Sequence, residues 1–207
     1  MSFPAVEIAT FVASDAYKGD SRVLYPALAL LKTIDGCNDI WYGTQIQDPS
    51  RFNLVIYWET LEHHQRYMDD KAEYAKLFAA ITPAITEFLG LYHFHFQPEI
   101  TPALDAPVTE IAGWVLAEGT DAAAFLARVR ELGETIYRDM PADVARGGFE
   151  LAMETDRRAA VVLGWQSLER FNEIVYANKQ VVEIVADLKG KAELDLKHLK
   201  LTKFEKH

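Results

Sequence analysis

Hydrophobic positions along the chain follow two spacings, and the order in which these spacings occur repeats once. Short apolar runs bounded by turn residues are typical of strands, whereas apolar positions three and four residues apart are typical of one face of a helix. Each half of the sequence has the order strand, helix, strand, strand, helix, strand. The pattern therefore predicts two α+β repeats of about 100 residues each, which is an ordinary domain size.

In the first repeat, turn and cap signals separate the expected elements. Asp35-Gly36 is a turn after the first helix, Thr60 is a suitable N-cap for the second helix, and Pro83 interrupts that helix. We expect Gly90 to close the helical region. The expected strands are 7–13, 39–47, 52–58 and 91–97, and the expected helices are 21–33 and 60–81, the latter with a break near residues 69 and 70.

The second repeat follows a proline-rich connector. Three prolines lie between residues 98 and 107, and such a segment is typical of a link between domains. We therefore expect a first repeat at 1–98, a linker at 99–107 and a second repeat at 108–207. The expected strands of the second repeat are 109–117, 149–154, 159–165 and 196–204, and its expected helices are 121–136 and 168–188.

Short matching segments support a duplication. Glu-Ile-Ala at 7–9 recurs at 110–112, and Trp-Glu-Thr-Leu-Glu at 58–62 recurs as Trp-Gln-Ser-Leu-Glu at 165–169. A unit of this order places both helices on one face of its sheet and leaves the other face bare. Two fused copies can bury these bare faces against each other, so we expect two tandem ferredoxin-like repeats packed sheet to sheet.

Two segments of the first repeat resemble a known superfamily. They are Trp-Glu-Thr-Leu-Glu-His-His at 58–64, which follows an apolar run and leads into the second helix, and Tyr-His-Phe-His-Phe at 92–96. They resemble the dimeric α/β-barrel superfamily, and within it the antibiotic-biosynthesis-monooxygenase domain and fungal proteins that carry two such domains. Because both repeats keep the tryptophan step, the resemblance covers nearly the whole chain and implies a pseudo-dimeric barrel.

The resemblance implies several activities rather than one. The superfamily includes cofactor-free monooxygenases, polyketide cyclases, haem-degrading enzymes, isomerases and proteins without known activity, so a shared fold does not settle the function. Related polyketide cyclases carry a catalytic histidine in the second helix, and the nearest position here is Glu73. A glutamate whose pKa is raised by burial could act as a base in its place.

Comparison of the two repeats points to polar groups inside the first one. With an offset of 107 residues, the inward positions of the second helix in repeat two are wholly apolar, as expected for a buried helix face. At three of these positions repeat one has His64, Tyr67 and Tyr74 instead. A few polar groups on an apolar wall are typical of a small-molecule site. The alternative is a core histidine with satisfied hydrogen bonds and tyrosines whose hydroxyls point outward.

The fourth strand adds two histidines. His93 and His95 share one face of this strand, and the same offset matches them to Lys200 and Thr202, which suggests a face that contacts water. Two histidines could bind a metal ion, but no third ligand is identifiable, so we expect no metal. A histidine here could instead be a general base. We therefore name His64, His95 and Glu73 as catalytic candidates.

Aromatic residues complete the set of candidates. Trp41 lies in an aromatic stretch that could line a ligand pocket, although a tryptophan in a strand is more often part of the core. The expected ligand-binding residues are Tyr67, Tyr74, Trp41, Tyr57, Phe11 and His93.

Composition limits the partners. The formal charge of -10 disfavours nucleic acid, and no uninterrupted apolar stretch is long enough to span a membrane. The single cysteine, Cys37, fits a reducing compartment, and the first residues do not have the pattern of a secretory signal. We expect a cytoplasmic protein that binds a hydrophobic small molecule, with no cofactor, and an exposed sheet edge could support a homodimer.

Three functions remain open at this stage. The first is a cofactor-independent monooxygenase, cyclase or isomerase that acts on an aromatic or polyketide-like molecule in secondary metabolism. There His64 or His95 would be the base, and Tyr67 or Tyr74 would donate a hydrogen bond. The second is a non-catalytic barrel that binds a small ligand or serves a stress response. The third is a haem protein with an axial histidine.

Overall fold

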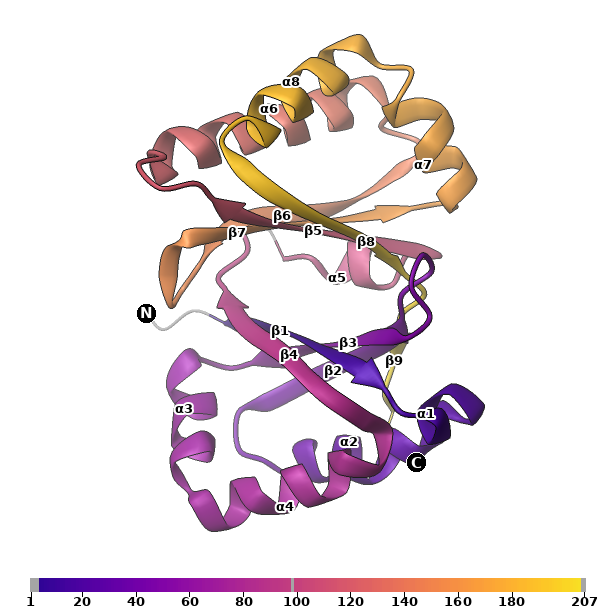
Figure 1. Cartoon of the computed structure of the whole chain (residues 1–207), viewed down its shortest axis with the longest axis vertical. Coiled ribbons are helices and arrows are strands. Elements are labelled where there is room, and N and C mark those ends of the chain that lie inside the picture. Colours follow the sequence, from indigo (N-terminus) through magenta and orange to yellow (C-terminus); the bar gives the residue numbers. More distant parts are fainter. Residues whose placement is uncertain (1–3, 98, 206–207) are drawn as a thin grey trace. The chain divides into compact units, whose positions relative to one another are not determined.

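The structure, a computed structural model, describes residues 4–97 and 99–205. These residues form two compact units (Figure 1). The first unit contains residues 4–93 together with 202–205, and the second contains Phe94–Leu201. The linker expected at 99–107 is therefore part of the second unit, and Pro98 lies outside the described residues.

The first unit contains one sheet with the strand order β4-β1-β3-β2-β9. β1 and β3 pair along nearly their full lengths in antiparallel register, with Glu7 opposite Ile56, and β2 pairs with the other edge of β3. The order of the first four strands, with helical segments after β1 and β3, is that of a ferredoxin-like fold. The strands are β1 Ala5–Ala13, β2 Cys37–Thr44, β3 Arg51–Trp58, β4 Ile85–Phe94 and β9 Thr202–Lys203.

Capping residues define the helical segments of the first unit. Thr60 is the N-cap of α3, and its hydroxyl accepts a hydrogen bond from the His63 backbone N–H. Asp70 ends α3 and caps α4 through the Glu73 N–H, which confirms the expected break. The segments are α1 Asp15–Gly19, η1 Ser21–Leu24, α2 Tyr25–Leu31, α3 Leu61–Asp69, α4 Lys71–Ile81 and η2 Thr82–Ala84.

The second unit repeats the same topology. Its strand order is β8-β5-β7-β6, and β5 pairs in antiparallel register with both β7 and β8. Asp121, Ser167 and Asn178 cap its three long helices through their side chains. The elements are α5 Thr101–Leu104, β5 Val108–Leu116, α6 Ala122–Asp139, β6 Val144–Ala152, β7 Thr155–Trp165, α7 Leu168–Val175, α8 Lys179–Lys189 and β8 Ala192–Leu199.

The connector covers part of the face that the sheet of the second unit leaves bare. A Cβ atom at Gly148 of β6 would lie within 3.0 Å of Phe96 and Ile100 side-chain atoms, and one at Gly164 of β7 would lie 2.6 Å from the Ala106 side chain. These glycines allow the connector, including α5, to pack directly on the sheet of the second unit. Pro102 and Pro107 therefore belong to a packed segment rather than to an extended link.

Three expected boundaries were wrong. The helix expected at 21–33 is divided into η1 and α2. The helical region ends with the turn η2 at Pro83, where the missing N–H prevents continuation, and β4 begins at Ile85, so Gly90 lies within a strand at a φ of 131°. The strand expected at 196–204 is two strands: β8 stays in the second unit, and β9 pairs with β2 of the first unit.

The α+β fold class is confirmed, with two ferredoxin-like units in tandem. The packing of the two sheets against each other stays a prediction. Among the described residues, no helix combines the length and the apolar character needed to cross a membrane.

Candidate functional site

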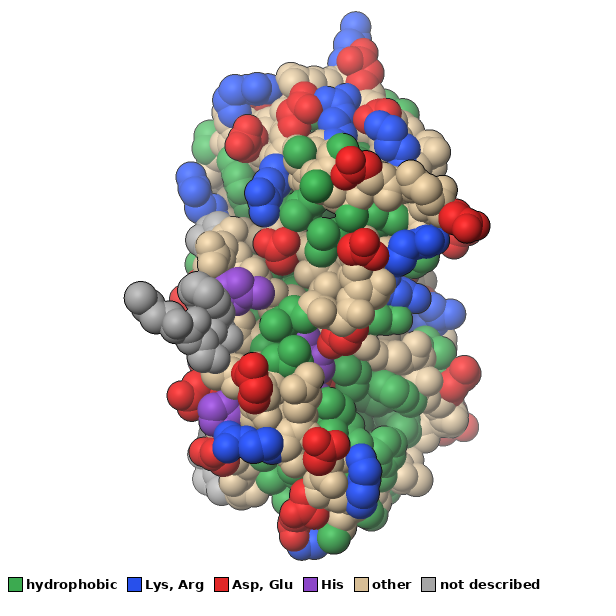
Figure 2. All heavy atoms as spheres, turned by 90° about the vertical axis from the view of Figure 1, so that its left-hand side faces the viewer, with side chains coloured by type: hydrophobic (Ala, Val, Ile, Leu, Met, Phe, Trp, Pro, Cys, Tyr) green, Lys and Arg blue, Asp and Glu red, His purple; other side chains and the backbone are tan. Residues whose placement is uncertain are grey.

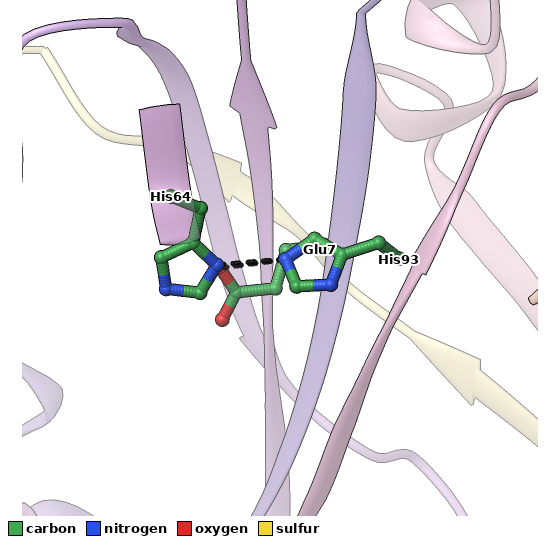
Figure 3. Close-up of side chains that lie close together, drawn as sticks. All are labelled: Glu7, His64 and His93. Carbon is green, nitrogen blue, oxygen red and sulfur yellow. Dashed lines mark hydrogen bonds and ion pairs between the residues drawn. The ribbon is translucent and has the colours of Figure 1, made fainter. Parts of the chain in front are cut away.

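The first unit buries a carboxyl group and two imidazoles beside one another. Glu7 lies on β1, His64 on α3 and His93 on β4, and only 5%, 2% and 1% of their respective surfaces are exposed. Figure 3 shows the three side chains converging from these elements. We call Glu7, His64 and His93 the Glu-His-His cluster.

The contacts within the cluster are short. His64 Nδ1 lies 2.7 Å from His93 Nε2 and 3.2 Å from Glu7 Oε2, and His93 Nε2 lies 4.0 Å from the same carboxylate oxygen. In Figure 3 the dashed line between the two imidazoles shows that His64 turns its Nδ1 toward His93, with its Nε2 on the other side of the ring. The cluster therefore holds His64 in one orientation.

Trp58 fixes the carboxyl group and the His64 ring. The indole Nε1–H donates a 2.8 Å hydrogen bond to Glu7 Oε2. The indole also stacks on His64, with the ring centres 4.5 Å apart and the planes 5° from parallel. Because Trp58 ends β3 and Thr60 caps α3, the strand-to-helix step itself brings His64 over Trp58.

A small cavity lies next to the cluster. Its volume is ≈ 50 Å³, which is smaller than the roughly 300 Å³ at the lower end of typical ligand pockets. Glu7 and His64 contribute its polar groups together with Tyr74, and Phe78 and Phe88, which are 46% and 44% exposed, lie at its surface. The remaining wall is aliphatic or aromatic and consists of Phe11, Leu31, Leu54, Ile56, Leu77, Ile81 and Leu91.

Two tyrosines extend this site. Burial raises the pKa of Tyr74 to about 12, and the nearby Glu7 carboxyl group adds to the effect. Tyr74 therefore keeps its proton at neutral pH and can donate a hydrogen bond into the cavity. Tyr67 packs against Trp58 and Tyr74, and its buried hydroxyl has no hydrogen-bond partner among the described residues.

The second unit keeps half of this arrangement. Trp165 Nε1–H donates a 2.7 Å hydrogen bond to Glu110 Oε2, and His198 lies opposite Glu110 in the register of β5 and β8. At the place of His64, however, Phe171 packs edge-on against His198, with ring centres 4.4 Å apart. The second unit therefore has the carboxyl group, the indole and one imidazole, but not the second imidazole.

A larger cavity accompanies this counterpart. It has a volume of ≈ 240 Å³, and Glu110 and Lys189 are the only charged residues of its otherwise largely aliphatic and aromatic wall. Burial raises the pKa of Glu110 to about 7, against the opposing effect of the Trp165 hydrogen bond. Burial also lowers the pKa of His198 to about 4, so His198 is neutral at physiological pH.

Comparison with known proteins places the fold but not the activity. No protein-family model matches the chain, and no curated protein matches it. The whole chain is similar in structure to an anthrone oxidase-like protein, with a TM-score of 0.73, 10% identity, and coverage of 98% of this chain and 92% of that one. This chain shares the fold of that protein.

Two bacterial structures agree with this result. A candidate monooxygenase from Fusobacterium nucleatum has a TM-score of 0.69 at 9% identity, with 100% of this chain and 99% of that chain covered. Another from Lactobacillus acidophilus has a TM-score of 0.65 at 11% identity, with 98% and 96% covered. At such low identity the likeness extends to the fold of the full chain and carries no site residue with it.

The structure brings together five of the residues singled out from the sequence. His64 and His93 belong to the Glu-His-His cluster, Tyr74 and Phe11 line the cavity, and Tyr67 packs beside it.

The other four candidates lie elsewhere. Glu73 is in the first turn of α4 and pairs with Lys76 at 2.5 Å, and its side chain is 44% exposed. His95 lies beyond β4, where Nε2 is 2.9 Å from the Gln97 amide. Trp41 and Tyr57 pack against each other, with ring centres 5.5 Å apart, and neither lines the cavity.

One assumption about the fourth strand was wrong. Lys200 was matched to His93, but His198 is the residue that faces Glu110. β4 and β8 begin 107 residues apart, at Ile85 and Ala192, but end 105 residues apart, at Phe94 and Leu199, so the helix offset of 107 does not hold at the end of the last strand. The second repeat also buries polar side chains, Glu110 and His198, which the comparison of the helices did not predict.

Glu7 and Trp58 are the functional candidates that the sequence analysis missed. Both occur in the segments that recur in the second repeat. A glutamate kept twice inside an apolar strand was the available signal, because a buried carboxyl group needs a partner.

The surface shows no concentration of basic side chains on the face in Figure 2, where Lys and Arg alternate with Asp and Glu and hydrophobic side chains are exposed between them.

Proposed function

We propose that the first unit is an acid–base catalyst that removes a proton from carbon in a small, largely hydrophobic molecule. The observation that carries this proposal is the buried Glu-His-His cluster at the wall of an otherwise apolar cavity. Proton removal from carbon is the step that cofactor-independent oxygenation, cyclisation and isomerisation have in common. The proposal therefore keeps the enzyme class expected from the sequence and gives it a specific base.

His64 is the base in this proposal. A proton on Nδ1 is favoured by the Glu7 carboxylate at 3.2 Å and by His93 Nε2 at 2.7 Å. In that tautomer the lone pair is on Nε2, which can accept a proton from the substrate. The imidazolium formed in this way is stabilised by the carboxylate, as in other base–carboxylate pairs. Glu7 and His93 are therefore positioning residues, and Trp58 holds Glu7 in place.

The cavity wall supplies the remaining parts. Removing the proton places negative charge on the substrate, and the protonated Tyr74 hydroxyl can donate a hydrogen bond to an oxygen that carries it. An aromatic substrate needs a few hundred Å³, which exceeds the ≈ 50 Å³ present. Phe78 and Phe88 must therefore move when substrate enters, and their exposure leaves them room to do so.

Of oxygenation, cyclisation and isomerisation, we favour oxygenation. The solved structures with a similar fold include an anthrone oxidase-like protein and candidate monooxygenases. Anthrone is a suitable probe, since its CH₂ group lies between two aromatic rings and is acidic. Its carbanion reacts with O₂ directly, and the balanced reaction converts anthrone and O₂ into anthraquinone and water.

The test is oxygen uptake and anthraquinone formation by the purified full chain. We expect His64→Phe, which installs the residue of the second unit, to lower kcat by at least about 100-fold, the usual contribution of a general base. His95→Phe is the matched control and should stay within about twofold of the wild type. Full turnover by a folded His64→Phe variant would remove His64 from the mechanism.

A second candidate function follows from the larger cavity. At ≈ 240 Å³ and with a mostly apolar wall, the cavity of the second unit suits a small apolar ligand with one polar group, held by Glu110 without catalysis. If this is the function, a co-purifying ligand found by mass spectrometry will be retained by the His64→Phe variant, and no variant of the first unit will change its amount.

A further inference from the structure

We propose that Glu7, His64 and His93 bind one divalent first-row transition-metal ion, such as Zn²⁺, in the first unit. Among the described residues, they form a group of three whose ligand atoms all lie within 4.8 Å of one another. No metal was expected from the sequence, because no third ligand was identifiable beside His93 and His95. In the structure the imidazole beside His93 is that of His64 rather than that of His95, and Glu7 of β1 supplies a carboxylate.

The distances between the three ligand atoms fit a metal ion. His64 Nδ1, His93 Nε2 and Glu7 Oε2 form a triangle with sides of 2.7, 3.2 and 4.0 Å. A single point lies about 2 Å from all three corners of such a triangle, and about 2 Å is the length of Zn–N and Zn–O bonds in proteins. At that point the His93 and Glu7 atoms lie on nearly opposite sides of the ion, so the side chains must shift by roughly half an ångström to reach the tetrahedral arrangement typical of Zn²⁺.

The chemical types of the ligands also fit. Two imidazole nitrogens and one carboxylate oxygen form a common set for Zn²⁺ and for Fe²⁺, with further positions left for water or substrate. The cavity is lined by Glu7 and His64, so space for such a ligand lies beside the proposed ion. Trp58, which donates to Glu7 Oε2 at 2.8 Å, would orient the carboxylate from outside the coordination sphere.

The charge balance of the cluster favours a cation. The ion pairs of Glu7 among the described residues are with His64 and His93, and all three side chains are at least nine-tenths buried. Taking a carboxyl group out of water is costly unless it is paired, and a divalent cation between the three side chains would offset that cost.

The second unit has an incomplete counterpart of the proposed metal site, with one ligand fewer. Glu110, Trp165 and His198 repeat the carboxyl group, the indole and one imidazole, but Phe171 replaces His64. Two ligands bind such ions more weakly than three, so the first unit alone should hold one. His64→Phe therefore converts the proposed site into an arrangement that the fold already accommodates.

An ion bound to His64 Nδ1 would leave the ring proton on Nε2, so metal binding and the acid–base function proposed above use different states of the same cluster. Metal content is measured without a substrate, and acid–base turnover should rise when a chelator removes the ion, so either proposal can fail alone.

The experiment uses the full chain after removal of metals with a chelator. Titration with Co²⁺, followed by its visible absorption, and with Zn²⁺, followed by calorimetry, should each give one ion per chain with micromolar affinity or tighter. Trp58→Phe should weaken binding about 10- to 100-fold, as loss of an outer partner does. His64→Phe and Glu7→Gln should each remove the site.

His95→Ala is the matched control and should bind one ion as the wild type does. Circular dichroism establishes that each variant is folded, and if His64→Phe does not fold, the nearly isosteric Glu7→Gln decides. Metal should raise the melting temperature of the wild type and of His95→Ala, and less so that of Trp58→Phe, but not that of His64→Phe or Glu7→Gln. Wild-type protein that binds neither ion more tightly than Glu7→Gln would overturn the proposal, and so would loss of binding in His95→Ala.

Discussion

At the scale of single residues, a glutamate–tryptophan hydrogen bond occurs in both units but has different neighbours. In the first unit Glu7 and Trp58 lie beside His64, whereas in the second unit Glu110 and Trp165 lie beside Phe171. The pair is therefore a structural feature of the repeat, and the second imidazole is what makes the first unit a candidate site.

The burial of Glu110 predicts a specific pH dependence of stability. Its pKa is raised from 4.5 to about 7 in the folded state. The stabilisation by protonated Glu110 is therefore fully present below pH 4.5 and is lost as the pH rises through about 7. As the pH rises from 4.5 to above about 7, the free energy of unfolding of the wild type should fall by roughly 3 kcal/mol relative to that of Glu110→Gln.

Urea denaturation of both proteins at several pH values measures this difference. His198 and the other titrating groups are shared by the two proteins, so their contributions largely cancel. Parallel stability curves between pH 4.5 and 8 would show that Glu110 is ionised in the folded protein as easily as in the unfolded chain.

The sequence predicted His64, Tyr67 and Tyr74 at inward positions because a helix face has a fixed period and the second repeat provided an apolar reference. It did not predict Glu7 as their partner, because contacts between strands depend on register, and register is not encoded locally. His93 was named as a candidate, but its place beside His64 required the three-dimensional structure.

At the scale of elements, the C-terminal segment is a part of the first unit. β9 pairs with the edge strand β2, and Phe204, which follows it, is buried and donates its backbone N–H to Ile40 at 2.8 Å. Its ring contacts Tyr25, with centres 5.4 Å apart. An edge strand that would otherwise be open for pairing is covered in this way.

Phe204→Ala should therefore lower the free energy of unfolding by about 3 kcal/mol, as for other buried phenylalanines. Lys203→Ala is the control, because Lys203 forms a partly exposed ion pair with Asp39 at 3.2 Å and should cost less than about 1 kcal/mol. Chemical denaturation compares the two variants, and equal costs would mean that the segment does not pack as described.

Element order was predictable because each strand and helix has its own hydrophobic period and its own caps, as at Thr60 and Asp70. The division of the last strand was not, because it depends on the strands with which β8 and β9 pair, namely β5 and β2.

At the scale of the whole molecule, two units with the same fold contain different cavities. The first has a small cavity with a Glu-His-His cluster, and the second has a larger and more apolar cavity with Glu110. The duplication was visible in the sequence through Glu7 and Trp58 and their counterparts. Where each unit ends was not, because the connector packs on the second unit and the C-terminal segment on the first.

The central claim is that His64 and His93 act as parts of one buried cluster, and a double-mutant cycle tests it most directly. The free energies of unfolding of His64→Phe, His93→Phe and the double variant are measured by chemical denaturation. We predict an interaction energy of about 1–3 kcal/mol, as for residues within one hydrogen-bond network. The parallel cycle of His64 with His95 should give less than about 0.5 kcal/mol. Additive effects of His64→Phe and His93→Phe would contradict the account.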